Sequence, residues 1–233
     1  MTPDLVRRLA AARAAKRPVV LATSLPDGRE LIWPDDNAPP ALPEAAAVAL
    51  DRDQSGTVRL ADGSTWMLTA CNPPLRLIVV GAVHAAQALV RMAAATGYAA
   101  TVIDPRRAFA TGERFPGTEL MHDWPDEAMD ALKPDTRTAV ITLTHDPKLD
   151  DPALDRALRS AAFHIGALGS RRTHARRLDR LRALGHDDTS LARIKGPVGL
   201  DIGAVTAPEI ALSIMAEIVA VRRHAAERAA KAA

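Results

Sequence analysis

Several short segments of this 233-residue sequence place glycine and charged side chains where a buried strand would end. The first is Gly81-Ala82-Val83-His84, which follows the apolar run from Leu75 to Val80. Gly81 and Ala86 fit the Gly-x-Gly-x-x-Gly pattern that holds a pyrophosphate between a strand and a helix. Val83 stands where a second glycine would let the backbone approach a phosphate closely. The segment therefore predicts either an anion site or a plain tight turn.

Asp104 closes the next apolar run, Ala99 to Ile103. It follows Gly81 at a spacing of about twenty residues. In dinucleotide-binding proteins an acidic residue at this spacing accepts a hydrogen bond from a ribose hydroxyl. Arg106, two residues later, can instead meet a phosphate. Asp104-Pro105-Arg106 can also form nothing more than a capped turn. The pair favours a nucleotide ligand and leaves its identity open.

A third group follows the run from Thr138 to Leu143, again where ligands collect in parallel sheets. His145 with Asp146 and Asp150 can be an acid–base pair or a partial metal shell. No second histidine stands at helical ligand spacing, so we predict no metal site. In the simpler interpretation, Asp150 or Asp151 caps a helix that starts at Pro152.

The fourth apolar run, Phe163 to Leu168, contains Gly166 and leads into Gly169-Ser170-Arg171-Arg172. A flexible turn, a serine N-cap and two guanidinium groups at a helix start predict an anion site. The arginines further along this helix are interpreted as a solvated face opposite Leu178 and Leu181. They are Arg176, Arg177, Arg180 and Arg182.

Short apolar runs that alternate with helical stretches are typical of a parallel sheet buried on both faces. The fold class predicted for residues 73–233 is therefore α/β, a Rossmann-like doubly wound parallel sheet. Its helices are expected at 84–96, 125–132, 151–160, 171–184 and 207–228. Thr206 and Glu209 form a capping box at the start of the last helix.

Asn72-Pro73-Pro74 interrupts regular structure and marks the predicted boundary with a small N-terminal α+β module over residues 1–72. This module is expected to hold a helix at 3–16, strands at 18–23 and 29–33, and a loop at 34–43. A hairpin is expected from 57–60 to 65–69, because Asp62-Gly63 suits a tight turn.

The composition narrows the functional classes. A net charge of +2 and only 3% aromatic residues argue against a nucleic-acid partner. No apolar stretch approaches the length that crosses a membrane, and no signal peptide is apparent, so we expect a cytoplasmic protein. The single cysteine, Cys71, excludes an internal disulfide and is interpreted as an incidental thiol.

Together these segments resemble the XdhC/CoxI family, the accessory proteins of xanthine dehydrogenase and related molybdenum hydroxylases. The resemblance covers most of residues 75–220. It depends on these blocks: Leu77 to His84, Val102 to Arg106, Phe109-Ala110, Glu113 to Pro116, Leu143 to Asp146, Asp150, Gly166 to Arg172, Pro197 to Leu200, and Glu209 to Ala211.

The resemblance implies a non-catalytic chaperone that binds the molybdenum cofactor, as molybdopterin or its cytosine dinucleotide. It further implies sulfuration by a cysteine desulfurase, delivery to the large subunit of a molybdenum hydroxylase, and a homodimer. In the N-terminal third, Ser24 to Arg29 is the nearest stretch to a Gly-Ser-x-Pro-Arg segment of longer family members.

Two other functions remain open from the residues alone. Gly81 and Asp104 also suit an NAD(P)-dependent oxidoreductase, with His145 as a proton donor. A structural domain that dimerises through the final helix is the third hypothesis.

Overall fold

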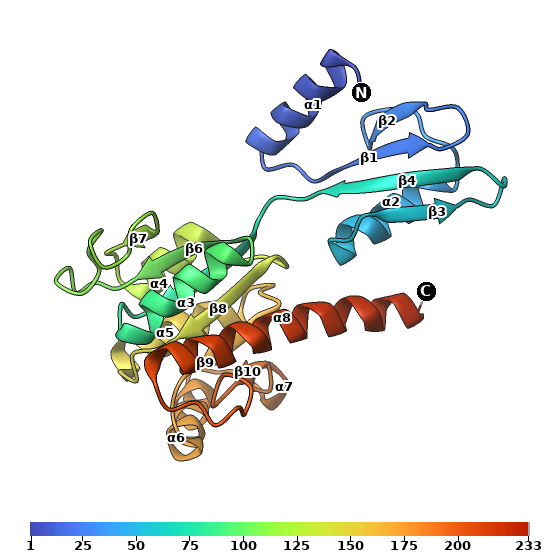
Figure 1. The fold of residues 1–233 in the computed structure, drawn as a ribbon. Helices are drawn as coiled ribbons and strands as arrows, with labels where there is room; N and C mark the ends of the chain where they lie inside the picture. The colour runs from blue at the N-terminus through green and yellow to red at the C-terminus, as the bar shows by residue number, and fades with distance from the viewer. Residues whose placement is uncertain (233) are drawn as a thin grey trace. The chain divides into compact units, whose positions relative to one another are not determined.

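The computed structural model describes the backbone of residues 1–232 and the side chains of residues 1–224. The chain divides into two compact units, one built on Met1–Pro73 and the other on Pro74–Ala225. Figure 1 shows that each of them combines helices with a β-sheet.

A six-stranded, entirely parallel sheet forms the centre of the C-terminal unit, with the strand order β10-β9-β8-β5-β6-β7. Its strands are β5 (Leu75–Val80), β6 (Tyr98–Ile103), β7 (Glu119–Met121), β8 (Thr138–Thr142), β9 (His164–Ala167) and β10 (Ile194–Lys195). The chain runs outward from β5 through β6 to β7, then returns to β8 and continues the other way. This confirms the predicted doubly wound Rossmann-like sheet, whose order reverses between β5 and β8.

Helices cover both faces of this sheet (Figure 1). One face packs against α3 (His84–Ala95) and α8 (Ala207–Ala232). The other packs against α4 (Pro125–Leu132), α5 (Pro147–Leu158), α6 (Arg171–Ala183) and α7 (Asp188–Leu191). Along β5, Leu77 and Val79 enter the first core, whereas Ile78 and Val80 enter the second. Because both faces are buried here, residues 77–80 form a continuous apolar run.

The four predicted strands and the five predicted helices of this unit are all present, and the capping box of α8 is confirmed. The Glu209 carboxylate accepts hydrogen bonds from the Val205 and Thr206 amides at 2.8 Å each. The predicted start of α5 is wrong: Asp146 caps the helix, Pro147 opens it, and Pro152 lies inside it. Both prolines follow an aspartate, so the sequence offered two starts, and the helix uses the earlier one.

The N-terminal unit contains a four-stranded antiparallel sheet in the order β2-β1-β4-β3. Its elements are α1 (Pro3–Ala14), β1 (Val19–Ser24), β2 (Glu30–Trp33), α2 (Leu42–Arg52), β3 (Gly56–Arg59) and β4 (Thr65–Cys71). α2 packs on one face through Leu42 and Ala46, and Leu5 and Ala12 of α1 pack on the other. α2 was not predicted from the sequence, because its start lies among prolines that favoured a loop.

Among the described residues, no helix combines the length and apolar character needed to cross a membrane.

Candidate functional site

The carboxyl ends of β5 and β8 meet where the strand order reverses. Gly81, directly after β5, has φ +108°, and a Cβ built on it would lie 2.4 Å from Thr144 Cγ2. Only glycine tolerates both this conformation and this contact. The predicted glycine turn therefore lies directly against the loop that follows β8, at the position where doubly wound sheets bind ligands.

Helix α3 begins immediately after this turn without a side-chain cap. Val83 is its N-cap residue and provides no hydrogen bond, and the first turn contains no acidic residue. By contrast, Thr2, Asp146 and Ser170 cap the starts of α1, α5 and α6. The Ala86 amide donates to the Val83 carbonyl oxygen at 3.1 Å. The His84 and Ala85 amides and the positive end of the helix dipole are available to an anion. The side chain of His84, the first residue of this helix, is exposed.

Asp104, at the end of β6, is completely buried, and hydrogen bonds fill all four of its acceptor positions. Oδ2 accepts from the Ala82 amide and from Arg106 Nη2, at 2.8 Å each. Oδ1 accepts from the Arg106 amide at 3.0 Å and from Arg106 Nε at 2.9 Å. In this geometry the carboxylate connects the β5 and β6 loops and orients Arg106. It has no acceptor position left for a ribose hydroxyl.

Opposing influences act on the pKa of this carboxyl. Burial alone would raise the pKa of Asp104, but the hydrogen bonds from Arg106 and from the Ala82 amide hold it below its ordinary value. Asp104 is therefore a carboxylate at neutral pH. The Asp146 and Asp150 carboxylates contribute to the raised pKa of Arg106, after Asp104 itself, so the loops after β6 and β8 are electrostatically coupled.

Asp150, also buried, organises the loop after β8. It accepts hydrogen bonds from Thr144 Oγ1 at 2.6 Å and from the His145 amide at 3.2 Å. These bonds support His145 in a left-handed conformation with φ +61° and an exposed side chain. Burial raises the pKa of Asp150, although Thr144 and Arg177 lower it. The caps of α5 differ from the prediction, because Asp146 caps the helix and Asp150 lies within its first turn.

Arg177 is the functional-site neighbour that the sequence analysis missed. It was interpreted as part of a solvated face, but it is only 1% exposed. Its Nη2 lies 3.4 Å from Asp150 Oδ2 and donates to the Leu168 carbonyl oxygen at 3.0 Å. Its position four residues before the buried Leu181, on the same side of the helix, was the available signal.

The loop after β9 lies next to the loop after β8. A Cβ on Gly169, which has φ +141°, would lie 3.5 Å from His145 Nδ1. The predicted Ser170 N-cap is confirmed by a 3.1 Å hydrogen bond from the Thr173 amide. Arg171 and Arg172 are exposed at the start of α6. Gly166 instead lies within β9, where a Cβ would meet Val198 and Ile141, so it serves packing.

Four loops thus share one edge of the sheet: Asp104 joins the first two, Gly81 contacts Thr144, and Gly169 approaches His145. Among the residues that the structure describes, no group of three or more His, Cys, Asp or Glu side chains is arranged to hold a metal ion. The edge instead presents backbone amides and guanidinium groups, which are suited to an anionic ligand.

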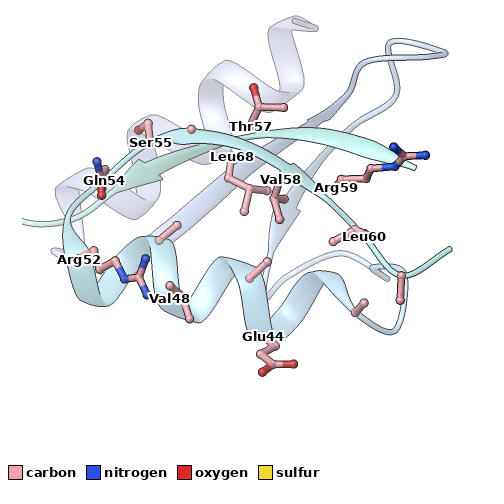
Figure 2. A pocket seen from close by; sticks show the side chains of 15 residues that line it. Glu44, Val48, Arg52, Gln54, Ser55, Thr57, Val58, Arg59, Leu60 and Leu68 are labelled. Atoms are coloured by element: carbon pink, nitrogen blue, oxygen red, sulfur yellow. The ribbon is translucent and has the colours of Figure 1, made fainter. Parts of the chain in front are cut away.

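A separate hollow of about 490 Å³ lies in the N-terminal unit between α2 and β3 (Figure 2). Val48, Val58 and Leu68 contribute its apolar lining, and Glu44, Arg52 and Arg59 add charge. None of the predicted site residues lines it. Size alone does not identify a site, so we place the candidate site at the sheet edge, where the chemically suited groups converge.

Comparison with known proteins gives a family match. Residues 77–218 match the family model of the XdhC Rossmann domain. The chain is 37% identical over 155 residues to the molybdenum cofactor insertion chaperone PaoD of Escherichia coli K12, an alignment that covers 66% of this chain and 42% of that protein. It is 32% identical over 155 residues to a probable xanthine dehydrogenase subunit from Bacillus subtilis 168, covering 66% of this chain and 45% of that protein.

A solved structure has a similar fold. The crystal structure of a xanthine dehydrogenase from Bacillus halodurans superposes with a TM-score of 0.72 at 22% identity, covering 95% of this chain and 64% of that one. At this identity the likeness concerns the fold. The alignments with the two curated relatives span less than half of their lengths.

Proposed function

This chain belongs to the XdhC Rossmann-domain family, whose model matches residues 77–218, and we propose that it binds the molybdenum cofactor and delivers it to a molybdenum hydroxylase. The ligand is held at the carboxyl edge of the six-stranded sheet, as molybdopterin or its cytosine dinucleotide. The names of the relatives, a molybdenum cofactor insertion chaperone and a probable xanthine dehydrogenase subunit, support this function.

The uncapped start of α3 is the observation that carries the proposal. Molybdopterin ends in a phosphate, and its dinucleotide form contains a pyrophosphate. Because no side chain caps this helix, the His84 and Ala85 amides after the Gly81 turn can donate hydrogen bonds to such an anion. Arg171 and Arg172 at the start of α6 add positive charge on the other side of the β8 loop.

The proposed role is that of a binding protein. The site residues hold and release a cargo, and the chemistry of the molybdenum centre belongs to the cargo and its final enzyme. The large subunit of that enzyme is the proposed recipient. Sulfuration of the cargo by a cysteine desulfurase and assembly into a homodimer complete the proposal, and they follow from the family resemblance alone.

The ligand is tested first by mass spectrometry of small molecules released from freshly purified protein. A pterin or a pterin–cytidine dinucleotide supports the proposal. A nicotinamide nucleotide in its place would favour the oxidoreductase alternative.

Two variants test the site. Val83→Asp places a carboxylate at the N-cap position, where it competes with the anion for the α3 amides while still capping the helix. We expect it to lose the retained ligand without losing thermal stability. Val83→Thr supplies a neutral cap of similar size and is therefore the matched control for the negative charge; it should retain more ligand than Val83→Asp.

The guanidinium groups are tested by combining Arg171→Ala with Arg172→Ala. The control combines Arg91→Ala with Arg176→Ala, which removes the same charge from exposed positions elsewhere on the unit. Retention that is equal in both double variants would remove Arg171 and Arg172 from the site.

A further inference from the structure

The loop after β6 presents an exposed aromatic ring beside a guanidinium plane. Arg106 Cζ lies 4.8 Å from the centroid of the Phe109 ring. Phe109 is 48% exposed, and the Arg106 side chain is 43% exposed. A phenylalanine exposed to this degree buries little apolar surface on folding, so the hydrophobic effect does not account for its position.

The Arg106 guanidinium is fixed in orientation. Its Nε and Nη2 each donate to a different oxygen of the buried Asp104, at 2.9 and 2.8 Å. This two-point contact determines the plane of the group as well as its position. With one edge held by Asp104 and the Phe109 ring beside it, the rest of the guanidinium is directed to solvent.

Arg114 anchors the same loop. Its Nη1 donates to the Phe109 carbonyl oxygen at 2.5 Å, and its Cζ lies 5.6 Å from the ring centroid of Phe115, which is buried in the core. The Phe109 backbone is therefore connected to the core through Arg114. The exposed ring and the guanidinium plane form a preorganised surface.

We infer that Arg106, backed by Phe109, is a stacking platform for the base of a nucleotide whose phosphates bind at the start of α3. The inference rests on the proposed phosphate site. Asp104 links the platform to the phosphate site directly, because the same carboxylate orients Arg106 and accepts a hydrogen bond from the Ala82 amide in the turn before α3. Guanidinium planes and aromatic rings both stack on nucleobases.

The ligand class follows from this platform. A planar heteroaromatic ring joined to a pyrophosphate can stack on the Arg106–Phe109 platform and bind the α3 amides at the same time. A phosphate alone contacts only the α3 amides. The platform therefore favours the dinucleotide form of the cofactor. A pterin ring shares this stacking chemistry, so the test includes a pterin phosphate.

The test measures binding of cytidine diphosphate, inorganic pyrophosphate and neopterin phosphate to the purified chain by isothermal titration calorimetry. Arg106→Lys keeps the charge beside Asp104 but removes the plane. Phe109→Leu removes the aromatic ring behind Arg106, whereas Phe109→Tyr keeps an aromatic ring there. Arg107→Lys makes the same exchange at the exposed neighbouring position and is the control.

We expect Arg106→Lys and Phe109→Leu to weaken the binding of cytidine diphosphate by roughly 5- to 150-fold, the change that corresponds to about 1–3 kcal/mol per stacked base. Pyrophosphate binding should stay unchanged, and Phe109→Tyr and Arg107→Lys should bind like the unmodified chain. A selective loss of neopterin phosphate instead would overturn the inference in favour of the pterin.

The two proposals fail differently. If cytidine diphosphate binds and neither Arg106→Lys nor Phe109→Leu weakens it, the platform is wrong and the phosphate site stands. If neither cytidine diphosphate nor pyrophosphate binds at millimolar concentration, both are wrong. Equal weakening of pyrophosphate and cytidine diphosphate would also overturn the platform, because the substitutions would then act on the phosphate site.

Discussion

Replacing Gly81 with alanine should destabilise the C-terminal unit through two separable causes. The residue has φ +108°, a conformation that costs an L-residue about 1–3 kcal/mol. Its new Cβ would also lie 2.4 Å from Thr144 Cγ2, and overpacking of this kind costs about 1–3 kcal/mol. The sum predicts a loss of roughly 2–6 kcal/mol in the free energy of unfolding, which is a large fraction of the stability of a domain.

The two causes can be separated with matched variants. Gly97→Ala meets nothing within 4 Å but has φ +83°, so it carries only the backbone term of about 1–2 kcal/mol. Gly112→Ala has neither problem and should change stability by less than about 0.5 kcal/mol. Thr144→Ser removes Cγ2 and keeps the hydroxyl that donates to Asp150.

The assay is urea denaturation followed by far-ultraviolet circular dichroism, completed as a double-mutant cycle between positions 81 and 144. The double variant Gly81→Ala/Thr144→Ser should recover about 1–3 kcal/mol of the loss, the overpacking part. Purely additive effects in the cycle would refute the contact between the β5 and β8 loops. A loss at Gly81 no larger than that at Gly97 would refute it as well.

Three further predictions concern the charged and capping groups. Asp104→Asn should lower the free energy of unfolding by about 2 kcal/mol at neutral pH, because two of the four hydrogen bonds lose their acceptor while the partly exposed Arg106 regains contact with water. Because folding lowers the pKa of Asp104, this difference should persist down to about pH 4 and vanish as the pH falls through the lowered pKa, as measured by urea denaturation at a series of pH values. Arg177→Met should lower the free energy of unfolding by about 3–5 kcal/mol at pH 7, because it leaves the buried Asp150 carboxylate without its arginine. Since burial raises the pKa of Asp150, the carboxylate takes up a proton as the pH falls, and the loss of stability should become smaller. Val83→Thr should raise the free energy of unfolding by about 0.5–1 kcal/mol in the absence of ligand, because it supplies the missing side-chain cap of α3. An unchanged midpoint of urea denaturation would contradict this reasoning.

The sequence predicted the parallel sheet because its strands are buried on both faces. Residues 77–80 and 139–141 are short apolar runs, a pattern typical of strands buried on both faces. The elements that the sequence analysis missed carry weaker signals. β10 has two residues, α7 has four, and α2 begins among prolines. Such elements are determined by pairing with a neighbouring strand or by packing against the sheet. The local sequence does not encode these contacts.

The candidate site was predictable as a location more than as a set of contacts. Glycines and charges at the ends of apolar runs indicated one edge, because parallel strands present their carboxyl ends together. The partners were not predictable. The sequence left Asp104 open between a contact to a ribose hydroxyl and a capped turn, and its acceptor positions are filled by Arg106 and the Ala82 amide. Arg177 was interpreted as exposed but is buried. These pairings depend on distances between loops.

Two buried carboxylates organise this edge in similar ways: Asp104 directly follows β6, and Asp150 lies in the first turn of α5. Their different surroundings give them different roles. Asp104 and Asp150 each accept backbone amides of a loop and each contact one arginine. The arginine on Asp104 faces solvent, whereas the arginine on Asp150 is 1% exposed. A ligand can reach only the first of the two guanidinium groups. Changes at Arg106 should therefore alter binding more than folding, and changes at Arg177 should alter folding first, because that group supports the β8 loop from beneath the surface.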